Sequence, residues 1–183
     1  MGESDKIFVI GEREGYAPQV GVLVSMLQNA RSFLLSAVRD LSTELLDAPP
    51  GPANNTIGSI LAHLDAAENM FQLITFEKRR WNEEEDARYR PAFEFKDSLT
   101  PRGRDLESYL RCLRETRERT LAGMRSRTDD WLKEPRTFGG RPANAYYYWL
   151  HYLQDEARHT GQIILVRKYL VEDADPEFDP YFH

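Results

Sequence analysis

Hydrophobic residues recur every three or four positions along four long segments of the chain, which is the pattern of helices with one buried face. In the first segment the apolar positions run from Val20 to Leu45, and Pro18 suits the first turn of a helix. The pattern predicts helices over residues 18–46, 57–80, 103–127 and 143–171.

The segments between these helices have a different composition. The proline-rich stretch at residues 46–52 must end the first helix, because consecutive prolines cannot continue it. Residues 54–56, Asn-Asn-Thr, supply side chains that cap the start of the second helix. Residues 81–100 are acidic and then aromatic and form a long connection with room for a short helix, and residues 128–142 form a loop.

Four long amphipathic helices with few strand signals predict an all-α fold, a four-helix bundle. At 183 residues the chain is long enough to bury a sizeable core as one domain. We expect that single domain to span residues 1–183, with residues 1–17 as an N-terminal extension and residues 172–183 as an acidic tail.

The composition is that of an ordinary soluble protein, with 41% hydrophobic and 30% charged residues. A net charge of −6 argues against a general nucleic-acid binder. The single cysteine, Cys112, cannot form an internal disulfide, and it reads as a small buried residue rather than a nucleophile. No stretch resembles a signal peptide or a bilayer-spanning segment. We therefore expect a cytoplasmic protein with neither a nucleic-acid nor a membrane partner.

The polar face of the third helix carries a local concentration of arginines. They are interleaved with glutamates, in the order Arg111, Arg114, Glu115, Arg117, Glu118 and Arg119. Charges of both signs at such spacing indicate a solvated, salt-bridged face rather than a surface for nucleic acid.

Two ionisable side chains stand among the aromatic and aliphatic residues that face the core on the last helix. Asp155 and His159 are four residues apart, which places them on adjacent turns of one face. His63 lies beside Ile60 and Leu64 on the apolar stripe of the second helix. A carboxylate in a core is costly unless it is paired, and imidazole and carboxylate groups bind divalent transition metals. His63, Asp155 and His159 therefore predict a metal site with positions open for water or substrate.

Two arrangements without a metal would satisfy the same side chains. One is a buried hydrogen bond between a histidine and Asp155. The other is an ion pair between Asp155 and an arginine, for which Arg158 and Arg31 are available. Spacing alone leaves these alternatives open.

His151 and Glu156 are two further candidates for a catalytic role on the last helix. His151 is a reserve ligand or a general base near the mouth of the site, or else a contact in an aromatic cluster with Tyr147 and Tyr148. Glu156 and His159 have the spacing of half a di-iron site. A second Glu-x-x-His is missing from the sequence, which excludes a di-iron centre.

Two segments resemble the DinB-like (YfiT-type) metalloenzyme superfamily. Residues 55–68, Asn-Thr-Ile-Gly-Ser-Ile-Leu-Ala-His-Leu-Asp-Ala-Ala-Glu, resemble its second helix, and residues 155–163, Asp-Glu-Ala-Arg-His-Thr-Gly-Gln-Ile, resemble its last. The resemblance covers nearly the whole chain and implies a four-helix bundle that holds one divalent metal ion, zinc or nickel, on three ligands. His63 and His159 match the ligand positions of that superfamily, whereas Asp155 stands where its motif usually has histidine.

Members of the resembled superfamily with known activity are metal-dependent transferases and isomerases that act with low-molecular-weight thiols such as bacillithiol, mycothiol or glutathione. The resemblance therefore implies an S-transferase or isomerase that acts on a small molecule through a metal-activated thiol or water. Two alternatives stay open: a metal-dependent hydrolase that needs no thiol, and a non-catalytic metal-binding protein of the stress response.

Two further expectations concern surfaces. The aromatic side chains of Tyr147 and Trp149, at outer positions of the last helix, favour a homodimer. The long connection at residues 81–100 and the loop at 128–142, with Trp131 and Phe138 as anchors, should wall a pocket over the metal.

Overall fold

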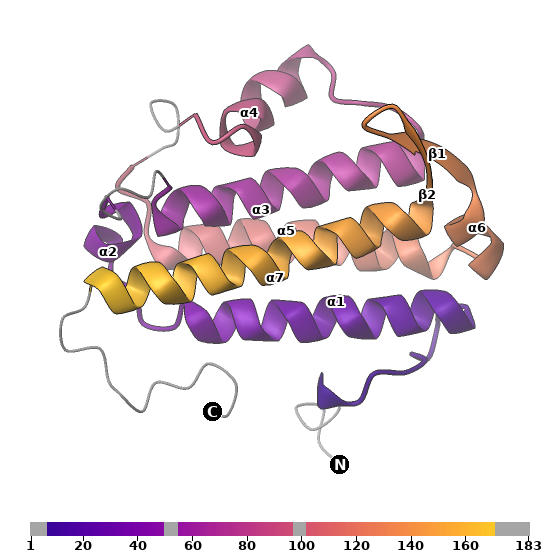
Figure 1. The fold of residues 1–183 in the computed structure, drawn as a ribbon, viewed down its shortest axis with the longest axis horizontal. Coiled ribbons are helices and arrows are strands. Elements are labelled where there is room, and N and C mark those ends of the chain that lie inside the picture. The colour runs from indigo at the N-terminus through magenta and orange to yellow at the C-terminus, as the bar shows by residue number, and fades with distance from the viewer. Residues whose placement is uncertain (1–6, 50–54, 97–101, 171–183) are drawn as a thin grey trace.

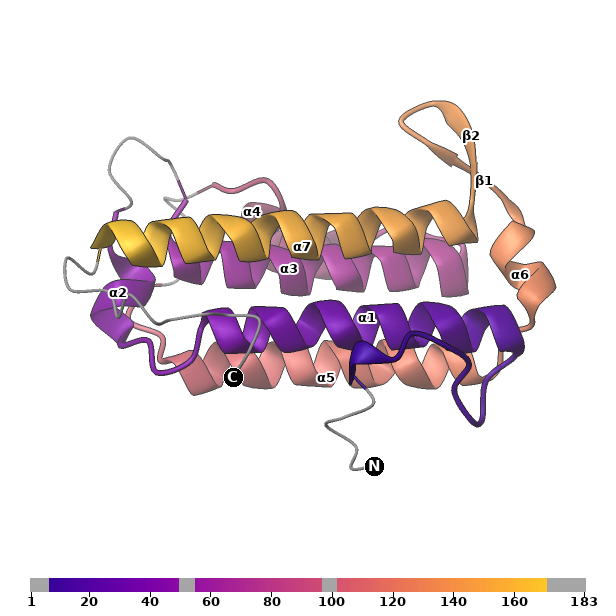
Figure 2. The ribbon, with the colours of Figure 1, turned by 60° about the horizontal axis from the view of Figure 1, so that its bottom comes forward.

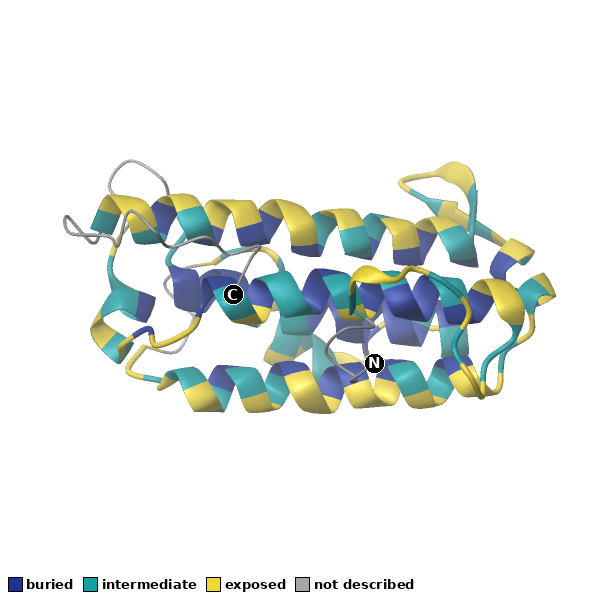
Figure 3. Ribbon diagram, turned by 90° about the horizontal axis from the view of Figure 1, so that it is seen from below, coloured by how far each residue is buried: buried dark blue, intermediate teal, exposed yellow. Residues whose placement is uncertain are grey.

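The computed structural model describes residues 7–49, 55–96 and 102–170, and four long helices dominate it (Figure 1). They are α1 Pro18–Ala37, α3 Ile57–Gln72, α5 Leu106–Arg125 and α7 Ala145–Leu170. Helices α3 and α7 form one layer, and α1 and α5 form the other (Figure 2). Their buried faces point into the bundle and their exposed faces point outward (Figure 3). The arrangement confirms the all-α four-helix bundle.

Helix α3 begins as the sequence predicts. The side chain of Thr56 accepts a hydrogen bond from the backbone nitrogen of Ser59 at 3.1 Å, which caps the first turn. The helix then continues as a π-helix over Leu73–Glu77 and ends at Lys78, whose backbone is left-handed with a φ of 58°. The predicted end near residue 80 is close to this point, but a hydrophobic pattern cannot reveal a π-helix.

Helix α1 ends at Ala37 rather than near residue 46, and a separate short helix, α2 Thr43–Asp47, follows it. The chain turns between them through Asp40, which has a φ of 59°. The prediction of one long helix was wrong because Val38 and Leu41 are buried even though they lie in the turn. Their apolar side chains continue the helical pattern after the helix itself has stopped.

Both long connections contain regular structure. Residues Glu83–Phe93 form α4, which packs on α3 (Figure 1). The segment after α5 is not a plain loop, since it contains α6 Asp129–Lys133 and an antiparallel hairpin of β1 Pro135–Phe138 with β2 Arg141–Asn144. Strands of four residues are too short to leave a readable alternation of polar and apolar positions.

Helix α7 supplies three of the seven buried aromatic side chains in the described part of the chain. The buried residues of its stripe include Tyr148, Tyr152, His159, Ile163 and Val166. Trp149 is completely buried against Phe76 of the π-helix, so the prediction that it lies on the outer surface was wrong. Tyr147 is 41% exposed, as expected. Trp149 therefore contributes nothing to the aromatic patch on which the homodimer prediction was based.

By length and composition alone, α1 could cross a membrane, contrary to the expectation that no segment is apolar enough to do so. Within the bundle, 50% of its most apolar window is buried, and it packs against α7. Val20, Leu27 and Leu34 are fully buried. Core packing therefore accounts for its apolar side chains.

Two arginines and two glutamates, one from each long helix, meet in the middle of the bundle. This central ion-pair cluster consists of Arg31 on α1, Glu68 on α3, Arg117 on α5 and Glu156 on α7, all of them buried. Arg31 lies 2.9 Å from Glu68 and also contacts Glu156. Arg117 lies 2.6 Å from Glu68 and 2.9 Å from Glu156. Each charge therefore meets two charges of the opposite sign.

Hydroxyl groups complete the cluster around Glu68. Tyr152 and Thr120 donate hydrogen bonds to its carboxylate at 2.9 and 2.7 Å. Burial alone would raise the pKa of Glu68, but the charges and hydrogen bonds of Arg117, Arg31 and Thr120 lower it to about 2. Arg117 was assigned to the solvated face of α5 from the sequence, which was wrong, because its guanidinium group points inward to these carboxylates.

We expect Arg117→Met to destabilise the protein by about 3–5 kcal/mol, because it leaves Glu68 and Glu156 buried with one cation instead of two. Urea unfolding followed by circular dichroism measures this change. The matched control is Arg114→Met on the same helix, where the arginine forms an exposed pair with Glu107 at 3.1 Å. The control should change stability little. Equal losses in both variants would contradict the assigned role of the cluster.

Candidate metal centre

His63, Asp155 and His159 come together where α3 and α7 pack side by side. One ligand atom from each lies within 4.8 Å of the other two, so the group could hold a metal ion. Asp155 Oδ2 is 3.2 Å from His63 Nε2, and Asp155 Oδ1 is 3.6 Å from His159 Nε2. We call these three residues the triad. The sequence predicted the meeting because each residue lies on the inward stripe of its helix.

Each imidazole of the triad is oriented by a second contact at its other nitrogen. His63 Nδ1 lies 2.9 Å from the backbone oxygen of Phe93, and His159 Nδ1 lies 2.7 Å from Oε1 of Gln162. These oxygens only accept hydrogen bonds, so each Nδ1 donates one, and in the neutral form of a ring its Nε2 then holds a lone pair. The lone pairs of both Nε2 atoms are then directed at the carboxylate of Asp155. Such an arrangement fits a cation bound between them.

Electrostatics favour the protonation states that a metal needs. Burial alone would raise the pKa of Asp155, but the hydrogen bond and charges that the two histidines offer when protonated, together with the charge of Arg158, hold it below its usual value. Burial lowers the pKa of His159, although Asp155 acts in the opposite direction. At neutral pH the carboxylate is therefore ionised and His159 is neutral, as metal ligands must be.

The contacts of the two metal-free alternatives are also present. Asp155 and His63 are within hydrogen-bonding distance at 3.2 Å. Arg158, which is 62% exposed, donates to Asp155 Oδ1 at 3.2 Å on the solvent side. Arg31, the other arginine considered, belongs instead to the central ion-pair cluster. The metal assignment therefore depends on both Nε2 atoms converging on Asp155, and it stays a prediction.

Aromatic rings from the connection after α3 cover the triad. The centroid of the Phe95 ring lies 4.2 Å from that of His63 and 5.5 Å from that of His159, and the Phe93 ring lies 5.7 Å from His63. This part of the connection lies over the triad, and the pocket expected between residues 81–100 and the metal stays a prediction. Residues 97–100 lie outside the described part of the chain.

The segment at residues 128–142, the second expected wall, lies nearer the N-terminal end of α7 than the triad does. Phe138 of the hairpin contacts His151, with ring centroids 4.7 Å apart, and the ring of Phe71 lies 6.0 Å from the same histidine. Tyr147 stacks on His151 at 6.0 Å. His151 thus sits in an aromatic cluster one helical turn from Asp155, and burial lowers its pKa. Its use as a ligand or general base stays a prediction.

Glu156, the other catalytic candidate, points away from the triad. Successive residues of a helix are about 100° apart, so its side chain leaves α7 on a different face from that of Asp155. Both oxygens of its carboxylate accept hydrogen bonds from arginines of the central ion-pair cluster. Its carboxylate is thus used to hold the bundle together.

Two contacts of the site were missed by sequence reasoning. Gln162 is three residues after His159 and could have been found, because residues at this spacing share a helix face. The contact of Phe93 with His63 uses a backbone oxygen. Every residue has one, so the sequence carries no signal for it.

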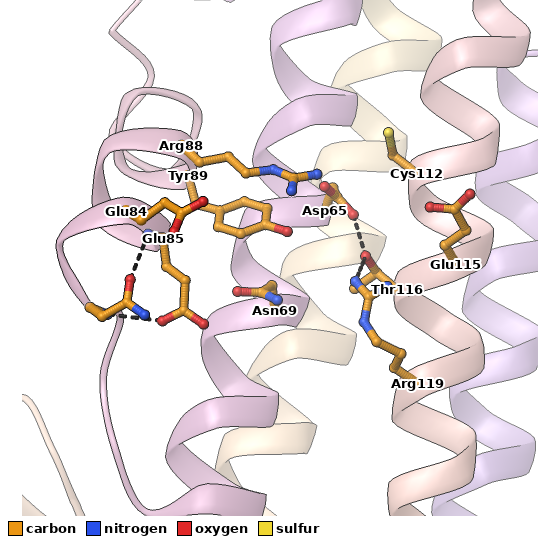
Figure 4. Close-up of a pocket in the computed structure, with 11 residues that line it drawn as sticks. Asp65, Asn69, Glu84, Glu85, Arg88, Tyr89, Cys112, Glu115, Thr116 and Arg119 are labelled. Carbon is orange, nitrogen blue, oxygen red and sulfur yellow. Dashed lines mark hydrogen bonds between the residues drawn. The ribbon is translucent and has the colours of Figure 1, made fainter.

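A polar cavity of about 550 Å³ lies between α3, α4 and α5 (Figure 4). Asp65 lines it and accepts a hydrogen bond from Thr116 at 2.5 Å. His63 and Asp65 are two residues apart, about 200° around the helix, so the cavity and the triad lie on different faces of α3. Cys112 also lines this cavity, accepting a hydrogen bond from Arg104, and is therefore only partly buried.

The helical bundle, with histidine and carboxylate groups meeting between its second and last long helices, is that of a DinB/YfiT-like protein. Within this superfamily, the model of the mycothiol-S-transferase family matches residues 22–171. The chain therefore belongs to the mycothiol-S-transferase family, whose name implies the low-molecular-weight thiol mycothiol as a substrate. No curated protein matches the chain.

Replacement of a triad histidine should abolish metal binding. We expect His63→Ala and His159→Ala to lose the metal, and Asp155→His to retain it, because imidazole replaces one good ligand with another. Metal content is measured by mass spectrometry on protein purified without chelator or an affinity tag that binds metal. Gln154→Ala, which changes an exposed side chain on the same helix, is the control and should keep the metal. Retention of full metal content in both alanine variants of the triad would refute the site.

Metal occupancy should fall as the pH drops below about 6, because protons then compete for the two imidazoles. Because the pKa of His159 is lowered, this histidine stays neutral at pH values below the ordinary pKa of histidine. The lowered pKa of Asp155 keeps its carboxylate ionised over the same pH range. Dialysis at a series of pH values followed by metal analysis tests this, with circular dichroism as a check on folding. Full occupancy at pH 5 would contradict the assigned ligands.

Proposed function

We propose that this protein is a metal-dependent S-transferase that uses mycothiol as its thiol substrate. Membership of the mycothiol-S-transferase family supports the choice of thiol. The observation that carries the proposal is the triad, in which both Nδ1 atoms are already engaged and both Nε2 atoms face Asp155.

In this proposal His63, Asp155 and His159 hold one divalent ion, zinc or nickel, and three protein ligands leave room for a thiol or water. Such an ion lowers the pKa of a thiol and so supplies a thiolate at neutral pH. The contacts with the Phe93 carbonyl and Gln162 hold the two imidazoles in place before the substrate arrives.

The remaining steps are assigned to neighbouring side chains. The rings of Phe93 and Phe95 limit access of water to His63, which strengthens electrostatic interactions in the site. The thiol loses its proton, its sulfur forms a bond to carbon in the second substrate, and the leaving group departs with its electron pair. His151, with a lowered pKa, is neutral at pH 7 and is our candidate to accept the thiol proton.

The test is turnover of a model electrophile that fluoresces when its carbon is attached to sulfur. We expect a rate that depends on mycothiol and on the metal, and His159→Ala should reduce it by about 10²-fold or more, since a metal contributes several kcal/mol. Addition of the metal should not rescue this variant. Glutathione in place of mycothiol tests the choice of thiol.

Two outcomes would support other functions of the same triad. Metal-dependent hydrolysis of a model ester at the same rate with and without thiol would identify a hydrolase that uses bound water. Stoichiometric metal binding without turnover of either substrate would favour a non-catalytic metal-binding protein. Either result would refute the proposed transfer reaction.

A further inference from the structure

A cavity of about 360 Å³ lies between the end of α3, the β1–β2 hairpin and the first turn of α7. Four of the side chains that line it are cationic, namely Lys78, Arg79, Arg80 and Arg136. Its other lining residues are Ile74, Thr137 and Tyr148. Among these described residues there is no carboxylate, so the cavity presents positive charge to whatever enters it.

The positive charges are only partly neutralised by the protein. Arg79 is paired with two glutamates outside the cavity. Glu134 lies 3.2 Å from Lys78 and 2.8 Å from Arg136 and is shared between them. The side chain of Arg80 forms no ion pair with any residue that the structure describes. With the two glutamates of Arg79 included, four cations meet three carboxylates, which leaves a surplus of one positive charge.

Backbone and side-chain features support a binding role for the same residues. Lys78 has a left-handed backbone, with a φ of 58°, directly after the π-helix. Strained residues and π-helices concentrate at functional sites. Arg136 is mostly buried and is held in place by Glu134 and by the backbone oxygens of Pro135 and Thr75. A guanidinium group fixed in this way beside a cavity is suited to bind an anion.

The cavity and the triad lie along the same seam between α3 and α7. Tyr148, which lines the cavity, is seven residues before Asp155, a rise of about 10 Å along the helix. The ring of Phe71 bridges the interval, with centroids 5.3 Å from Tyr148 and 6.0 Å from His151. The two places therefore lie on one face of α7, about two helical turns apart.

We propose that this cavity binds the anionic group, a carboxylate or a phosphate, of the second substrate while the reacting carbon of that substrate lies at the triad. The inference rests on the proposed function and adds the substrate class: an electrophile with a negative group about 10 Å from its reactive carbon. Arg80, Lys78 and Arg136 are the residues that select it.

Direct binding tests the anion site without turnover. Inorganic phosphate and succinate are titrated into the metal-loaded protein at low ionic strength and followed by calorimetry. We expect saturable binding of at least one of them, weakened about tenfold by Arg80→Gln, which removes one charge-assisted contact. Arg114→Gln removes the same charge from an exposed position on α5 and should weaken binding less than about twofold. His159→Ala should leave it unchanged, which separates the cavity from an open metal position.

The second measurement compares a carboxylate-bearing electrophile with its neutral amide analogue. Arg80→Gln should lower the ratio of their kcat/KM values about tenfold through KM. Absence of saturable anion binding, or equal weakening by Arg80→Gln and Arg114→Gln, would overturn the inference. Anion binding without any thiol transfer would refute the proposed function and leave the anion site standing, so the two failures are distinguishable.

Discussion

The pairing of Arg31 and Arg117 with Glu68 and Glu156 is the constraint on which the rest of the structure depends. Burying four charges is tolerable only when each has partners, and here the charges cancel within the cluster. Because each residue comes from a different helix, the cluster fixes the rotation of all four helices about their axes. A rotation of α7 that removed Glu156 from the arginines would also turn Asp155 away from α3. The structural cluster thereby positions the candidate metal ligand next to it in the sequence.

Asp155 and Glu156 show how one helix can give neighbouring carboxylates different environments. Glu156 is fully buried and bonded to two guanidinium groups, so its charge is fixed by the bundle. Asp155 is partly exposed and faces two imidazoles and a solvent-exposed arginine. The first is committed to holding the fold, whereas the second has partners that can be exchanged for a cation. In a di-iron bundle, glutamates in the core bind metal. Here the core glutamates Glu68 and Glu156 are bonded to arginines instead.

The sequence predicted the features that depend on a pattern of residues repeated along a single helix. The four helices and the inward direction of His63, Asp155 and His159 follow from periodicity, because these residues share stripes with apolar ones. The pairing in the central ion-pair cluster could not be predicted in this way, because periodicity gives the face of each residue but not its partners on other helices. Arg117 lies four residues after Leu113 and seven before Met124, so it shares the buried face of α5, whereas Arg114 is exposed. The hairpin and the contact of Phe93 with His63 depend on short strands and a backbone atom, for which the sequence has no pattern.

The hydrogen bond between His63 and the backbone of Phe93 links the last residue of α4 to a candidate ligand on α3. The same segment places the rings of Phe93 and Phe95 over the site. An outward movement of α4 would uncover the site and also release the imidazole to rotate about its side-chain bonds. Entry of a molecule from this side and exchange of an ion held by the triad would then be kinetically coupled, since one opening event would govern both. The lifetime of the bound ion would be set by how often α4 opens as well as by the strength of its ligands.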